Sequence, residues 1–317
     1  MAQEASLPDG DFMLGVLGGS GLYELPGLTD VREETVETPF GPPSAPVVLG
    51  RLGSTRVAFL ARHGRGHRLS PSEVNYRANI HALKQLGVRR ALSVSAVGSL
   101  RESIVPGDLV LADQFIDKTH GRASTFFGGG IVGHVSFADP VCAEWTGIVA
   151  QSALAAGAVP ADSDVAAEFD EAGGAMARRP PRLHRVGTYV CMEGPQFSTR
   201  AESHLHRAWG ADVIGMTAVT EAKLAREAEL CFAVLALSTD FDCWRVDEEP
   251  VTAAAVLEVL KTNVARARES VAGVAARATE AKACRCARAA EHAIFTAPSA
   301  VSAEARARLQ TLYGRYL

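Results

Sequence analysis

The chain has 317 residues, of which 47% are hydrophobic and 21% are charged, and its mean hydropathy is +0.07. This composition predicts a folded globular protein with a sizeable core. A net charge of -4 and a pI near 6.2 give no electrostatic basis for nucleic acid or an anionic membrane as a partner. No apolar run approaches the ~20 residues of a membrane-spanning helix.

The N-terminus and the cysteines indicate the compartment. Met1–Ala5 lacks the basic-then-apolar order of a signal peptide. The six cysteines are scattered, which fits a reducing compartment better than a disulfide framework. We therefore expect a cytoplasmic enzyme, with the nucleus as an alternative.

Short apolar runs alternate with helical patterns along the chain, and this alternation predicts an α/β fold. A helix is expected from Ser72, its N-cap, to Leu86, and Gly87 ends it. Further helices are expected after Ser198 and from Val251 to about Ala267. Strands are expected at Met13–Leu17, Val47–Leu49, Val57–Ala61, Ala91–Val97, Asp108–Ala112, Val186–Met192, Asp212–Met216 and Cys231–Leu237.

Two segments depart from this alternation. Residues 159–183 are rich in Ala, Pro and charged residues, which predicts a surface insertion. From about residue 280 the chain is rich in Ala and Arg, which predicts a helical C-terminal extension. Cys284 and Cys286 lie one residue apart there, but two ligands make no zinc site. Incidental cysteines on a helix are favoured over a redox or metal role.

Several predicted strands end in residues suited to binding an anion. Residues 15–21 form a glycine-rich loop in which Ser20 adds a hydroxyl, although a tight turn explains the loop equally well. Arg62 and His63 follow the third or fourth predicted strand and offer donors for phosphate oxygens, and a basic surface loop is the alternative. Residues 93–99 end another strand in small hydroxyl residues, which can bind the same anion or cap the next element.

The later strand ends carry groups suited to a nucleoside. Phe197 can stack on a flat base, or it can fill the core. Ser198 lies where a helix begins, and nearby residues resemble capping chemistry. Met216 offers an apolar surface for a sugar, although methionine is also a common core residue.

Asp240 and Asp242 follow the apolar run 232–237, which reads as a buried strand. Ligands of open α/β sheets bind at the carboxyl ends of the strands. If the extended geometry persists through Phe241, both carboxylates lie on the same side, and their repulsion raises the pKa of at least one. Such a pair can protonate a heterocyclic leaving group, whereas a loop whose aspartates cap a helix or face water is the alternative.

Taken together, these motifs resemble the trimeric purine nucleoside phosphorylase family, and within it the branch that cleaves 5'-methylthioadenosine. The resemblance covers roughly residues 12 to 270, apart from 159–183. It implies a single domain over residues 1–317, in which a mixed twisted β-sheet is flanked by helices. The matching segments begin at Gly18, Leu60, Val74, Gly98, Pro106, Asp113, Glu193 and Thr239.

The resemblance also implies a role for individual residues. Met216 lies against the ribose and Phe197 beside the purine. His134 reaches the 5' end of the nucleoside from a neighbouring subunit of a homotrimer. Phosphate is held by Ser20, Arg62, His63, Ser95, the main-chain N–H of Ala96, and Thr217. The positions tied to specificity are Ser198, Ala253, Val256 and Leu257.

The expected reaction is phosphorolysis without a cofactor or a metal, with inorganic phosphate as co-substrate. Asp240 faces purine N7 as general acid, and Asp242 faces the six-substituent. Carboxylates at both positions favour six-amino purines, because an exocyclic amine donates a hydrogen bond. The alternatives are a broader purine nucleoside phosphorylase, a hydrolytic nucleosidase and a non-catalytic nucleotide-binding protein. Ser20, Ser95, Gly215 and Ala253 differ from the residues usual in the methylthioadenosine branch.

Overall fold

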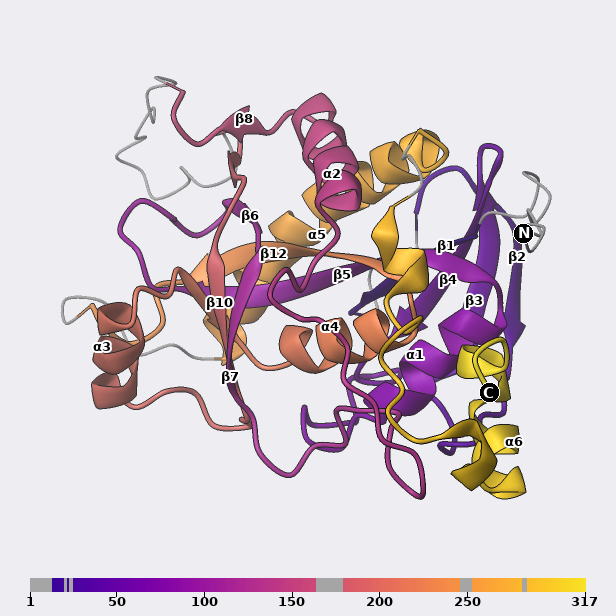
Figure 1. The fold of residues 1–317 in the computed structure, drawn as a ribbon. Coiled ribbons are helices and arrows are strands. Elements are labelled where there is room, and N and C mark those ends of the chain that lie inside the picture. The colour runs from indigo at the N-terminus through magenta and orange to yellow at the C-terminus, as the bar shows by residue number, and fades with distance from the viewer. Residues whose placement is uncertain (1–12, 20–21, 23–24, 164–178, 246–252, 281–283) are drawn as a thin grey trace.

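The framework of the protein is a 12-stranded mixed β-sheet with helices on both faces (Figure 1). The computed structural model describes residues 13–19, 22, 25–163, 179–245, 253–280 and 284–317. The strands are β1 Met13–Gly18, β2 Leu28–Glu34, β3 Val47–Leu52, β4 Thr55–Ala61, β5 Val88–Ser99, β6 Leu109–Leu111, β7 Gln114–Lys118, β8 Val159–Pro160, β9 Arg182–His184, β10 Thr188–Met192, β11 Val213–Gly215 and β12 Cys231–Asp240. Along the main path their order is β2-β3-β4-β1-β5-β12-β6-β9-β8.

Four neighbouring strands in the middle of the sheet, β4, β1, β5 and β12, run parallel to one another. They are apolar and covered on both faces, as parallel strands require. Their carboxyl ends therefore lie at one edge of the sheet. At that edge Gly18 pairs with Ala61, and Asp240 pairs with Gly98.

Helices cover both faces of this sheet (Figure 1). On one face lie α1 (Tyr76–Gln85) and α4 (Ala218–Glu227), and α6 (Ala303–Tyr313) packs beside α1. On the other face lie α2 (Ala143–Ala155) and α5 (Ala253–Arg277), which pack against each other. Short α3 (Arg200–Ala208) follows β10 at the far end of the molecule.

The last residues of β5 connect this sheet to a smaller group of strands. Ser99 pairs with Val213 of β11 in an antiparallel arrangement, β11 pairs with β10, and β10 pairs with β7. A small core of Leu100, Val190, Ala211, Ile214, Phe241 and Trp244 holds the two groups together. The segments after β10 and β11 are thereby brought to the edge where β12 ends.

The predicted strands are present, with shifted ends, but the start of α1 was predicted wrongly. Its N-cap is Asn75, whose side-chain oxygen accepts a hydrogen bond from the Ala78 N–H at 3.1 Å. Ser72 instead donates a hydrogen bond to Glu193. Gly87 follows the helix with a φ of 88°, a conformation that glycine adopts without strain.

The other predicted helices begin close to where we expected them. α3 begins after Thr199, which forms a capping box with Glu202. α5 extends to Arg277, beyond the predicted end at Ala267. No sequence pattern predicted β2, β7, α2 and α4: β2 is an exposed edge strand, and α2 lacks a clear polar face.

The segment 159–183 is only partly an insertion. Its described ends form β8 and β9, which pair with each other, and β9 also pairs with β6, so these ends belong to the sheet. Residues 164–178 lie outside the described part of the chain. The C-terminal extension is helical only in part, with short turns at Arg285–Arg288 and Pro298–Ala300 before α6. Between them Ile294 pairs with Gly133.

Candidate active site

Asp240 and Asp242 lie at the carboxyl edge of the parallel strands. The main-chain N–H of Asp242 donates a hydrogen bond to Oδ1 of Asp240 at 2.8 Å. The Thr239 hydroxyl donates to Oδ2 of Asp240 at 2.7 Å. Two local hydrogen bonds thus hold the Asp240 carboxylate in one orientation.

Extended geometry through Phe241, the condition for placing both carboxylates on the same side by alternation, is not present. The register of β12 against β5 shifts between Ser238 and Asp240, and Asp242 has a φ of 50°. The chain therefore turns after the strand, and period-two alternation does not place the two carboxylates. They are neighbours because the turn brings the Asp242 N–H onto Asp240. Oδ2 of Asp242 is buried and has no hydrogen-bond partner among the described residues, so it can accept a donor from a ligand.

Gly98 makes room for both carboxylates. A Cβ atom at residue 98 would lie 2.8 Å from Oδ1 of Asp240 and 3.3 Å from Cβ of Asp242. The Asp240 oxygen cannot easily move away, because Thr239 and Asp242 already bind that carboxylate. A glycine at the end of β5 is thus a steric requirement of the pair.

Thr217 lies at the N-cap of α4, and its side chain is 3% exposed. Its hydroxyl is buried without a hydrogen-bond partner in the described part of the chain. The N-terminus of a helix has unpaired N–H groups and a partial positive charge, so it favours an anion. An oxyanion placed here would satisfy the Thr217 hydroxyl.

Arg62 follows β4 as predicted, but its guanidinium is already bound within the protein. It forms a two-pronged ion pair with Glu221 of α4, with an Nη2–Oε2 distance of 3.0 Å, and it also donates to Ser93 and to the Val94 carbonyl. Burial lowers the pKa of Arg62, but the Glu221 carboxylate outweighs that effect and the pKa is raised. Arg62 therefore stays charged and joins the end of β4 to the first turns of α4.

The geometry of His63 differs from that of the phosphate donor that the sequence predicts. Its Nδ1 lies 2.9 Å from the Leu69 carbonyl, which can only accept, so Nδ1 carries the hydrogen. Burial, helped by the charge of Arg62, lowers the pKa of His63 to about 4. A neutral His63 thus presents an acceptor at Nε2.

Ser95 is buried on β5, where its hydroxyl lies 3.3 Å from the hydroxyl of Tyr189, and Ala96 is the next residue. Gly215 on β11 leaves space for that tyrosine, because a Cβ there would lie 1.9 Å from the Tyr189 oxygen. Burial raises the pKa of Tyr189, so its hydroxyl stays protonated. Gly215 is therefore explained by packing against Tyr189.

Arg122 and Glu193 form a half-buried clamp beside Met216 that no local sequence pattern indicated. Nε of Arg122 lies 3.0 Å from Oε1 of Glu193, and Nη1 donates to the Met216 carbonyl at 2.5 Å and to the Tyr76 hydroxyl at 3.1 Å. Desolvation alone would raise the pKa of Glu193, but hydrogen bonds from Ser72, His120 and Arg122 and the Arg122 charge lower it. The clamp fixes the main chain of half-buried Met216.

Phe197 and Ser198 lie on the loop between β10 and α3. Phe197 is 49% exposed, so the alternative of a core residue is wrong. The Cys243 thiol lies 3.2 Å from the Ser198 carbonyl and joins this loop to the segment that carries Asp242. Phe197 therefore lies on an exposed loop that is joined to the segment carrying Asp242.

His134 is exposed and lies away from these groups in sequence. Its main-chain N–H donates to the Ala293 carbonyl at 2.8 Å, and its ring packs edge-on against Phe295 at 5.2 Å. Phe295 is 74% exposed and Val132 is 53% exposed. An apolar surface with His134 on it is thus formed by two segments distant in sequence.

Four predicted site residues lie wholly or partly outside the described part of the chain. Ser20 lies outside the described residues. Ala253, Val256 and Leu257 fall in the opening turns of α5, where the backbone is described and the side chains are not.

The sequence and the structure are similar to those of known proteins. The profile of the phosphorylase superfamily matches residues 13–279. S-methyl-5'-thioadenosine phosphorylase of Geobacter sulfurreducens is 51% identical over 306 residues, which cover 96% of this chain and 99% of that protein. The enzyme of the same name from Koribacter versatilis is 50% identical over 303 residues, with 96% of each chain covered.

Solved structures agree with these relatives. A methylthioadenosine phosphorylase sourced from an antarctic soil metagenomic library has a TM-score of 0.84 and 48% identity, covering 94% of this chain and 98% of that chain. Methylthioadenosine phosphorylase from Schistosoma mansoni in complex with adenine has a TM-score of 0.79 and 38% identity, covering 92% and 99%. The sheet and its flanking helices are therefore shared with these proteins.

Proposed function

The chain belongs to the phosphorylase superfamily, and we propose that it converts S-methyl-5'-thioadenosine and inorganic phosphate to adenine and 5-methylthioribose-1-phosphate. The two S-methyl-5'-thioadenosine phosphorylases compared above match 96% of this chain at 51% and 50% sequence identity. The observation that carries the choice of base is the Asp240–Asp242 pair, in which Oδ2 of Asp242 is buried and unpartnered among the described residues.

Asp242 is proposed to read the six-position of the purine. A six-amino group donates hydrogen bonds and pairs with a carboxylate, which only accepts. A six-oxo group would face the same carboxylate acceptor to acceptor, and a mispaired buried polar group costs about 1–3 kcal/mol. The pair therefore favours adenine over hypoxanthine and guanine as the leaving base.

Asp240 is proposed to act at N7. Cleavage of the C–N glycosidic bond proceeds through a cation-like sugar, as in glycoside hydrolysis. Electrons move onto the departing purine, and a proton supplied at N7 neutralises it, a step typically worth about 10²–10⁴-fold in rate. The hydrogen bonds from Thr239 and Asp242 orient the Asp240 carboxyl for this transfer.

Phosphate is proposed to bind at the N-terminus of α4. The Thr217 hydroxyl there has no hydrogen-bond partner among the described residues, so it can donate to phosphate. Ser95 and the Ala96 N–H come from the neighbouring β5. Ser20 is proposed to add a donor and Nε2 of His63 to accept from a protonated phosphate oxygen. Arg62 is proposed to hold the first turns of α4 in position for the phosphate through its ion pair with Glu221. Phosphate so placed attacks the sugar and stabilises its positive charge.

The remaining proposed contacts are with the sugar, its 5' substituent and the open side of the purine. Met216 offers its thioether to the ribose, and Phe197 covers the purine from the rim. Ser198, together with Ala253, Val256 and Leu257 in the opening turns of α5, is proposed to set specificity. No cofactor is proposed to take part, since phosphate itself is the second substrate.

We propose a homotrimer in which His134 completes the site of a neighbouring subunit. The exposed apolar side chains of Val132 and Phe295 beside His134 support this assignment, because burying them would favour association. Phe295→Glu should shift the molar mass in light scattering from trimer to monomer, and Val31→Glu, on the exposed edge strand β2, should not. A wild-type protein that is a fully active monomer would contradict the trimer.

We also propose the cytoplasm, or alternatively the nucleus, as the compartment. None of the six cysteines forms a disulfide in the structure, which suits a reducing environment. Within the described residues, no helix is both long and apolar enough to cross a membrane.

A substrate comparison tests the proposed function. The products formed from methylthioadenosine, adenosine and inosine, each with phosphate, should be separated and quantified at equal substrate concentrations. Methylthioadenosine should give the highest kcat/KM, with adenine and the sugar phosphate in equal amounts. If inosine were cleaved as efficiently as methylthioadenosine, the role assigned to Asp242 would be wrong.

A further inference from the structure

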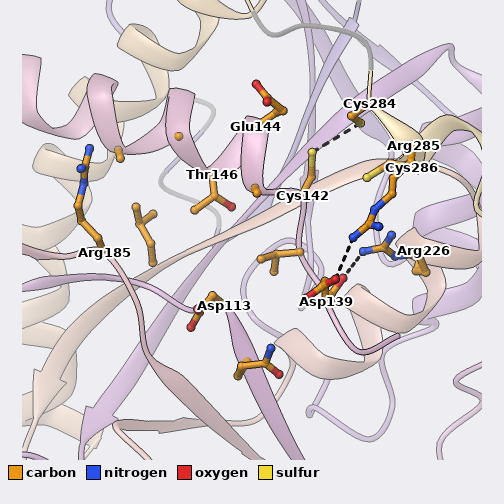
Figure 2. Close-up of a pocket in the computed structure, with 16 residues that line it drawn as sticks. Asp113, Asp139, Cys142, Glu144, Thr146, Arg185, Arg226, Cys284, Arg285 and Cys286 are labelled. Carbon is orange, nitrogen blue, oxygen red and sulfur yellow. Dashed lines mark hydrogen bonds and ion pairs between the residues drawn. The ribbon is translucent and has the colours of Figure 1, made fainter. Parts of the chain in front are cut away.

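Four cysteines from three distant parts of the chain converge at one point. Cys142 precedes α2 and Cys231 begins β12. Cys284 is the N-cap of the short helical turn Arg285–Arg288, and Cys286 lies inside that turn. Their sulfur atoms all lie within 4.8 Å of one another. Figure 2 shows three of them, Cys142, Cys284 and Cys286, grouped at one side of a pocket of ≈ 770 Å³.

The spacing of the sulfur atoms suits a shared metal ion. The Cys142 and Cys284 sulfurs are 3.7 Å apart, and the Cys231 and Cys284 sulfurs are 3.1 Å apart. A disulfide would need a sulfur separation of about 2.05 Å. In a tetrahedral site with zinc–sulfur bonds of about 2.3 Å, the sulfurs are about 3.8 Å apart. The Cys142–Cys284 distance matches this value. A small rotation of the Cys231 side chain would bring the Cys231–Cys284 distance to the same value.

The donor set selects the class of metal. The cluster contains four thiols and, among the described residues, no carboxylate or imidazole. Four sulfur ligands in a tetrahedral arrangement favour zinc over the hard cations, which prefer oxygen. Cys142 and Cys286 are buried, and Cys231 and Cys284 are half-buried, so the site is enclosed but can be reached from the pocket.

We propose that Cys142, Cys231, Cys284 and Cys286 bind one Zn²⁺ in a structural site. Four thiols release four protons as the four zinc–sulfur bonds form, and no atom is oxidised or reduced. A site with all four positions filled by protein ligands leaves none for a substrate. The ion would instead join the start of β12, the start of α2 and the C-terminal segment.

The cysteine cluster and the proposed catalytic residues lie at opposite ends of β12. Cys231 is the first residue of β12 and Asp240 is the last. At about 3.3 Å per residue, the two ends of this strand are roughly 30 Å apart. The C-terminal segment that the ion would anchor leads on to Ala293 and Phe295, which contact His134.

Metal analysis tests the proposal. The full-length protein, purified without chelators and with a reductant, should contain one zinc ion per chain by plasma mass spectrometry. Cys142→Ser and Cys286→Ser should lose that zinc, whereas the matched control Cys191→Ala, at a buried cysteine outside the cluster, should retain it. Zinc in the wild type that is no higher than in the cluster variants would overturn the proposal, and so would iron in its place.

A second measurement needs only the wild type, in case a variant does not fold. Alkylation of the native protein, read by peptide mass spectrometry, should spare the four cluster cysteines until a chelator is added. The same chelator should lower the melting temperature, because a metal bound only by the folded state stabilises it. Alkylation that is equal with and without chelator, or disulfides between cluster cysteines, would refute the zinc site.

Discussion

The main-chain N–H of Asp242 donates a hydrogen bond to Oδ1 of Asp240 at 2.8 Å, and this bond makes the two carboxylates one structural unit. The bond uses the backbone of Asp242 and not its carboxylate. The side chain of residue 242 can therefore be changed without releasing Asp240.

Asp242→Asn should move the preference from six-amino toward six-oxo purines. Asparagine tolerates a φ of 50°, is nearly isosteric, and can donate as well as accept. Correcting or creating one mispaired polar contact is worth about 1–3 kcal/mol, so the ratio of kcat/KM for inosine over adenosine should rise about ten- to a hundred-fold.

Asp240→Ala is the matching variant at the other carboxylate. It should depress turnover of every purine, because protonation of the leaving group is common to all. If Asp242→Asn lowered both substrate classes equally, residue 242 would not read the six-position.

Gly98→Ala should reduce kcat/KM about a hundred-fold, because a displacement of about 1 Å at a catalytic group costs roughly that much. The added methyl would meet Oδ1 of Asp240 at 2.8 Å. Gly147→Ala in α2 is the control, since a methyl there meets nothing within 4 Å. Wild-type kinetics in Gly98→Ala would show that the position of Asp240 is not critical.

Thr217→Val should raise the KM for phosphate about ten- to a hundred-fold, as expected for one hydrogen bond to a charged group. Stability should not fall, because the hydroxyl has no partner among the described residues. Thr146→Val, which also removes an unpartnered hydroxyl near the start of a helix, should leave the phosphate KM unchanged.

Arg62→Ala is a less direct probe of the same pocket. It would leave the carboxylate of Glu221, which is 1% exposed, without its partner. Breaking a buried ion pair in this way costs about 3–5 kcal/mol, so a lower melting temperature should accompany any change in phosphate binding. Thr217→Val is therefore the decisive variant: if it left the phosphate KM unchanged, phosphate would not bind at the N-terminus of α4.

His63 should not titrate in the working range of the enzyme. Burial and the charge of Arg62 lower its pKa from 6.5 to about 4, so it is neutral above that value. The ratio of kcat/KM for phosphate between the wild type and His63→Gln should therefore be constant from about pH 5.5 to about pH 8. A ratio that changed with a midpoint near 6.5 would mean that His63 acts as a cation.

The lowered pKa of His63 also affects stability. The unfolded state binds a proton below pH 6.5 that the folded state does not bind until about pH 4. Stability contributed at this position is therefore lost as the pH falls through that window.

Much of the site was predictable because parallel strands carry their carboxyl ends to one edge of the sheet. The order of apolar runs and polar ends predicted that the residues after β4 and β12 lie at one edge, and the parallel register of β4, β1, β5 and β12 places Arg62 and Asp240 there. Thr217 follows β11, which runs antiparallel to the end of β5. Local geometry was harder to predict. The register shift before Asp240 depends on how β12 pairs with β5, and no single strand shows it.

Residues with distant partners were missed for a related reason. Glu221, Arg122 and Tyr189 carry no local pattern, and each acquires its role from a side chain far away in sequence. The cysteine cluster is similar, since Cys142 and Cys231 join the close pair only after folding.

The central claim is that phosphate is the nucleophile, and the initial rate of adenine release at decreasing phosphate concentration tests it most directly. With methylthioadenosine saturating and phosphate removed enzymatically from the buffer, the rate should extrapolate to zero. Each adenine released at higher phosphate should be matched by one 5-methylthioribose-1-phosphate. A rate that persists without phosphate and yields the free sugar would contradict the account and identify a hydrolase.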